Sequence, residues 1–175
     1  MSRSASYSAA LPIAFVVLRI LIVLNWLVGA AIIALLLVMP NERWIISAFN
    51  LTPGVEAERI VMGLRAIAVV GLTTIPLNHV VLTRLLAMVG TVRAGDAFVA
   101  ANAYRLRAIA WTLLALQLLG VVIFAIAETI STPAHPVDID AGVSVNGWLA
   151  VLLAFILARV FAEGTLMRDD LEGTV

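Results

Sequence analysis

Four long runs of apolar residues, separated by shorter polar stretches, dominate the chain. The runs extend over about residues 13–39, 60–88, 106–128 and 143–163. Each has the roughly 20 residues that a helix needs to cross the hydrocarbon core of a bilayer. None alternates apolar and polar residues as membrane β-strands do, and a helix satisfies its backbone groups within one segment. The pattern predicts an all-α integral membrane bundle of four transmembrane helices, a single membrane domain over 1–175 with a cytoplasmic tail at 164–175.

Composition supports lipid as the solvent of these helices. The chain is 63% hydrophobic, whereas about 45–50% is typical of soluble domains. The formal net charge is zero, so nothing in the charge balance indicates direct binding of nucleic acid. Cysteine is absent, which excludes disulfides, thiolate catalysis and cysteine-ligated metals.

The arginines predict the orientation of the helices, because positive residues gather on the cytoplasmic side. One side of the predicted membrane holds eight arginines and the other holds only Arg43, Arg59 and Arg65. The eight are Arg3, Arg19, Arg84, Arg93, Arg105, Arg107, Arg159 and Arg168. Both termini and the central loop are therefore predicted to be cytoplasmic, in a multi-pass protein of a bacterial cytoplasmic (inner) membrane.

One arginine lies near the predicted cytoplasmic end of each helix, and two interpretations are open. Long arginine side chains near the interface can extend their charge into the headgroups and serve as topology anchors. Alternatively, some of them converge on a cytoplasm-facing polar pocket with Glu163, Asp96 or the tail carboxylates. The Asn78-His79 pair, which follows Pro76 in the second helix, either belongs to a kinked helix with His79 hydrogen-bonded inside the bundle or contributes to such a pocket as a proton relay or ligand. The candidate pocket residues are Arg19, Asn78, His79, Arg84 and Arg159.

Other polar and small residues within the apolar runs are assigned to packing. Asn25 and Gln117 are single amides that suit hydrogen bonds between helices. Small residues at four-residue intervals permit close approach of another helix, within the chain or in a second copy. This stripe comprises Ala150, Ala154, Ala158 and Ala162.

Catalytic, metal and cofactor sites have no positive support in the sequence. Gly-rich phosphate loops, a Ser/His/Asp pattern and HExxH are all missing, and two histidines on opposite sides do not suit haem ligation. His135, Asp138 and Asp140 have the chemistry of metal ligands, but they lie in a proline-broken loop without a fourth ligand. We therefore expect no enzyme activity, no metal and no cofactor.

The most distinctive segments are the central loop and the tail. In the loop, Gly95-Asp96 predicts a turn, Phe98 is an apolar anchor and Asn102 suits the N-cap of the third helix. In the tail, Arg159 and Glu163 are spaced to pair on one helical face.

These two segments resemble the bacterial membrane family known as domain of unknown function 2975. The loop is similar at Gly95, Phe98, Asn102, Arg105, Leu106 and Arg107, although Ala97 stands where the family pattern has proline. The tail is similar at Phe161, Glu163, Gly164, Arg168, Asp170, Leu171 and Gly173-Thr174-Val175. The resemblance implies a four-helix architecture without an established activity. It also implies association with a small helix-turn-helix regulator, held at the membrane by the cytoplasmic face.

The favoured hypothesis is a non-enzymatic membrane protein whose loop and tail bind a cytoplasmic protein partner. The candidate contact residues are Asp96, Phe98, Asn102, Arg105, Arg107, Glu163, Arg168, Asp169, Asp170, Leu171 and Val175. A small transporter, channel or lipid-binding protein that uses the pocket near Asn78 and His79 is one alternative. An accessory subunit of a larger membrane complex, or a homo-oligomer, is the other.

Overall fold

The structure, a computed structural model, is all-helical over the residues that it describes. These are residues 4–38, 46–47, 54–133, 136–137, 139 and 144–172, with side chains placed from residue 11 to residue 167 within those ranges. The helices are α1 (Ser4–Val38), α3 (Val55–Arg93), α4 (Ala100–Ile130) and α5 (Val145–Glu172). All four are long and apolar enough to cross a membrane. The predicted fold class is confirmed.

The helices extend beyond the apolar runs that predict them. Helix α3 has 39 residues, or about 58 Å at 1.5 Å per residue, whereas the hydrocarbon core is about 30 Å thick. Its first turn carries Glu56 and Glu58 and its last turn carries Arg93. Carboxylates at an N-terminus and a guanidinium at a C-terminus favour the helix dipole, so polar residues continue the helix outside the lipid.

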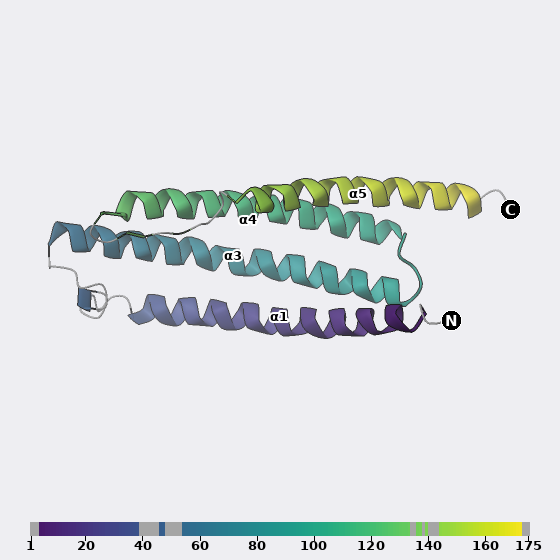
Figure 1. The fold of residues 1–175 in the computed structure, drawn as a ribbon, viewed down its shortest axis with the longest axis horizontal. Coiled ribbons are helices and arrows are strands. Elements are labelled where there is room, and N and C mark those ends of the chain that lie inside the picture. The colour runs from purple at the N-terminus through teal and green to yellow at the C-terminus, as the bar shows by residue number, and fades with distance from the viewer. Residues whose placement is uncertain are drawn as a thin grey trace.

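The four helices pack in chain order as an open form of the predicted bundle. Helix α3 contacts α1 and α4, and α4 contacts α5, whereas the described parts of α1 and α5 do not touch. Figure 1 shows this row, with successive helices running in opposite directions. A helix surrounded by lipid gains no hydrophobic burial by closing the bundle, so many large apolar side chains stay exposed.

Small residues set the close approach between neighbouring helices. A Cβ atom on Gly63 of α3 would stand 2.3 Å from Ile130 Cγ2 of α4, and one on Gly147 of α5 would stand 2.5 Å from Gln117 Oε1 of α4. Such contacts replace the missing hydrophobic force between membrane helices with dense packing.

The predicted packing roles are confirmed for Asn25 and for part of the alanine stripe. Asn25 Nδ2 donates a hydrogen bond of 3.0 Å to the Ile75 carbonyl on α3. Ala154 and Ala158 are buried, and α5 packs against α4, so this part of the stripe serves contact within the chain. Ala150, in contrast, is exposed. His135, Asp138 and Asp140 lie outside the described residues.

Both described ends of the chain and the α3–α4 loop (residues 94–99) lie at one end of the row (Figure 1). We call this the loop end; it is the end predicted to be cytoplasmic.

Candidate functional site

The α3–α4 loop begins with a tight helix stop that its sequence encodes. Gly95 has a φ of 90°, a left-handed conformation that glycine adopts without the steric cost of a Cβ atom. The Gly95 amide donates to the Val92 carbonyl at 3.1 Å, and the Asp96 amide donates to the Thr91 carbonyl at 3.0 Å. This is the Schellman pattern of a glycine-terminated helix. The predicted turn at Gly95-Asp96 is confirmed.

Asn102 clamps the loop between the two helices. Its side chain is completely buried, and its Nδ2 donates to Thr91 Oγ1 at 2.8 Å and to the Ala97 carbonyl at 2.9 Å. Its Oδ1 accepts a hydrogen bond of 2.8 Å from Arg105 Nη1. The predicted N-cap role of Asn102 is wrong, because the N-cap is Val99, three residues earlier and in extended conformation, and α4 begins at Ala100. Asn102 stabilises the loop from inside and Arg105 supports it.

Phe98 fastens the same loop to α5. Its ring lies against that of Phe161 with centroids 5.1 Å apart and planes inclined by 28°. Gly164 makes this contact possible, because a Cβ atom there would stand 3.1 Å from Phe98 Cδ1. Helices α3, α4 and α5 therefore meet at the loop end through one short segment.

Helix α5 continues past this loop. It runs on from Phe161 to Glu172, about 16 Å at 1.5 Å per residue, and its end projects beyond the other helices in Figure 1. Thr165 is buried, but Leu166 and Met167 are 64% and 62% exposed. Of the tail candidates, Arg168, Asp169, Asp170 and Leu171 lie on this helical extension, and Val175 lies outside the described residues.

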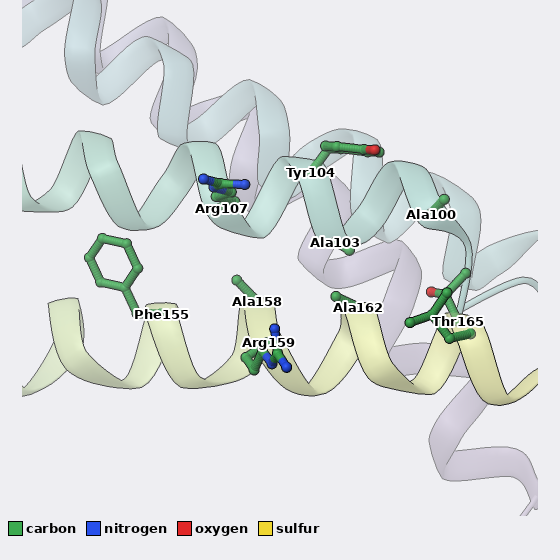
Figure 2. A pocket seen from close by; sticks show the side chains of 10 residues that line it. Ala100, Ala103, Tyr104, Arg107, Phe155, Ala158, Arg159, Ala162 and Thr165 are labelled. Atoms are coloured by element: carbon green, nitrogen blue, oxygen red, sulfur yellow. The ribbon is translucent and has the colours of Figure 1, made fainter.

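A groove of about 580 Å³ separates α4 from α5 on one side, at the loop end. We call it the α4–α5 groove. Figure 2 shows Arg107 of α4 and Arg159 of α5 at similar levels, with alanines between the helices and Phe155 farther from the loop end. The lining residues are Ala100, Ala103, Tyr104, Arg107, Phe155, Ala158, Arg159, Ala162, Thr165 and Leu166.

Two lining residues of this groove have contacts outside it. Phe155, at the end away from the loop, meets the Trp111 ring edge to face with centroids 5.3 Å apart. Arg159, midway along the groove, donates from Nε to Glu163 Oε1 at 2.6 Å, in the predicted i, i+4 pair. Both side chains of this pair are largely exposed, at 78% and 55%.

The residues of the candidate polar pocket are spread over separate places. His79 Nδ1 accepts a hydrogen bond of 3.2 Å from Trp26 Nε1, and their rings are 5.4 Å apart. Arg19 lies 4.8 Å from the centre of the Phe15 ring on α1, whereas Arg159 lines the α4–α5 groove on a helix that α1 does not contact. Arg84 is exposed and Asn78 is half-buried on α3.

Sequence reasoning missed Tyr104 and Phe155 as site residues and Trp26 as the partner of His79. Ala100, Ala103 and Arg107 are spaced by three and four residues, as are Phe155, Ala158 and Ala162. That spacing places each set on one helical face. Helix-face patterning therefore held a signal for the groove, but the register between α4 and α5 did not follow from it.

Four helices that are long and apolar enough to cross a membrane, with little buried interior, define a multi-pass α-helical membrane protein. The chain belongs to the family described as "Protein of unknown function (DUF2975)", which it matches over residues 37–175. The resemblance seen in the loop and tail is thereby confirmed. Almost all of helix α1 lies before the matched region. No curated protein and no solved structure matches the chain significantly.

Proposed function

We propose that this chain is a non-enzymatic protein of the bacterial cytoplasmic membrane that docks a cytoplasmic protein on the projecting end of α5. The observation that carries the proposal is a helix that leaves the loop end with Leu166 and Met167 exposed. We call residues 163–172 of α5, together with Phe98, the docking end.

The position of the α3–α4 loop supports placing the docking end outside the hydrocarbon. Non-helical backbone exposed to lipid does not occur within the hydrocarbon region, because its polar groups would lack partners. Phe161 lies level with this loop through its contact with Phe98. The residues of α5 that follow therefore lie among headgroups or in water, where exposed leucine and methionine favour burial against a partner.

The charges of the docking end favour a partner with a basic surface. Residues 164–172 contain one arginine and three carboxylates, from Asp169, Asp170 and Glu172. An amphipathic helix that inserts apolar residues into a groove is a common recognition mode, and flanking charges select the partner. A small helix-turn-helix regulator, which the family resemblance implies, has the basic surface that this chemistry requires.

The test places a photo-crosslinking amino acid at Met167 in the full-length protein in its native membrane. The matched control carries it at Leu157, which is similarly exposed but lies within the apolar part of α5. We expect a protein adduct at position 167 and lipid adducts only at position 157. The Asp169→Asn/Asp170→Asn double substitution should weaken the protein adduct, since it removes two carboxylates.

The captured protein must then bind the purified membrane protein in a salt-dependent manner, and Leu166→Glu should abolish that binding. Lipid adducts alone at both positions, or a protein adduct insensitive to Leu166→Glu, would overturn the proposal.

A further inference from the structure

A second site overlaps the docking end at Thr165 and Leu166, but its ligand does not depend on the proposed function. We propose that the α4–α5 groove binds an anionic phospholipid, with its phosphodiester between Arg107 and Arg159 and an acyl chain running toward Phe155.

The depth of the groove matches the headgroup region of a leaflet. From Leu166 to Phe155 it follows α5 for about 16 Å at 1.5 Å per residue. Its outer end lies near the non-helical α3–α4 loop, whose backbone groups require polar surroundings, since Phe98 packs on Phe161. At its inner end Phe155 lines the groove and packs on Trp111. A molecule in the groove therefore passes from a polar to an apolar environment, as a phospholipid does.

The charge in the groove selects an anion. Arg107 and Arg159 come from different helices, and the groove lining includes no carboxylate. Glu163 engages the Nε atom of Arg159, which leaves the terminal nitrogens of that guanidinium as donors. Guanidinium groups bind phosphate oxygens through paired hydrogen bonds, and basic pockets between membrane helices suit anionic headgroups. A zwitterionic lipid brings a cation that these arginines repel.

The volume of the groove suits part of one lipid molecule. The groove offers about 580 Å³, within the range of small-molecule sites. Alanines at positions 103, 158 and 162 line this space, so an acyl chain can lie against them.

The test measures quenching of Trp111 by lipids with brominated acyl chains in nanodiscs. Trp26, Trp44 and Trp148 are replaced by phenylalanine, so that the tryptophan at the inner end of the groove alone reports. Brominated phosphatidylglycerol is titrated against brominated phosphatidylcholine. We expect half-maximal quenching at a fraction of the anionic lipid about tenfold lower than that of the zwitterionic lipid. Two interfacial arginines would provide a preference of this size.

The Arg107→Gln/Arg159→Gln variant should lose this preference. The matched control Arg84→Gln/Arg93→Gln removes two exposed arginines of α3 outside the groove and should keep it. Native mass spectrometry of both variants should show retained phosphatidylglycerol on the control only. The helical signal in circular dichroism spectra verifies that each variant is folded.

Four results would overturn the proposal. The first is equal quenching by the two lipids in the unsubstituted groove. The second is an equal loss of preference in both variants, which would indicate general surface charge. The third is displacement of the lipid preference by soluble glycerophosphate, which would mean that the groove reads a free phosphate rather than a lipid. Retention of a protein in place of lipid would likewise contradict it.

Discussion

Single buried residues decide how the helices of this protein meet. Asn102 joins α3, the loop and α4 through one amide, and Asn25 supplies a polar contact between α1 and α3. A buried amide that loses its partners costs about 1–3 kcal/mol, which is large for a protein with so few buried side chains. Gly63, in contrast, lets α3 and α4 approach closely because it has no side chain to meet Ile130.

Gly63→Ala should destabilise the α3–α4 contact by about 1–3 kcal/mol, because the new methyl group meets the buried Ile130 side chain. Thermal unfolding in mild detergent measures the change. Gly71→Ala is the matched control, since nothing lies within 4 Å of a Cβ atom at that position of the same helix. That substitution should be neutral or slightly stabilising, because alanine favours helix over glycine. Ile130→Ala should rescue Gly63→Ala; a purely additive double variant would contradict the steric explanation.

Among the elements, the short α3–α4 loop is a segment that joins α3, α4 and α5 at the loop end. Hydrogen bonds hold it to both of its own helices, and the Phe98 ring holds it to α5, far away in sequence. The Phe98–Phe161 contact therefore ties the position of this loop to that of α5.

Phe98→Ala should loosen the loop from α5 while the four helices persist. The expected result is faster tryptic cleavage at Arg93 and Arg105, because the segment between them loses its anchor. A double-mutant cycle with Phe161→Ala should give a coupling energy of about 0.5–1.5 kcal/mol, as measured for aromatic pairs. A second cycle with Phe98→Ala and Phe155→Ala should instead give additive changes in the free energy of unfolding, since Phe155 packs on Trp111. Equal coupling in both cycles would contradict the direct contact.

For the whole molecule, both described ends lie at the loop end, and the distribution of arginines predicts that this end faces the cytoplasm. The chain contains no cysteine, so single cysteines report without background. In intact cells, a membrane-impermeant maleimide should label Val145→Cys at the opposite end but not Leu166→Cys. In permeabilised cells, both cysteines should be labelled. Labelling of Leu166→Cys in intact cells would reverse the orientation and remove the cytoplasmic docking proposal.

Much of this architecture could be predicted from sequence because the bilayer imposes a length on each apolar run. Local chemistry also predicted the Gly95-Asp96 turn and the Arg159–Glu163 pair. Asn102 was assigned to a cap because its sequence neighbours suit one, but its partner Thr91 lies on another helix. The Trp26–His79 pair and the α4–α5 groove likewise depend on the register between helices. In lipid that register follows from small-residue contacts, which apolar patterning does not encode.

The side-by-side arrangement of the helices has a consequence for any passage of solutes. A row of helices encloses a channel only when its first and last helices are also in contact. The described parts of α1 and α5 do not touch. Across the described helices, one copy forms a wall with lipid on both faces rather than a tube. A permeation route would require a second wall, so copy number in the membrane would decide whether such a route exists.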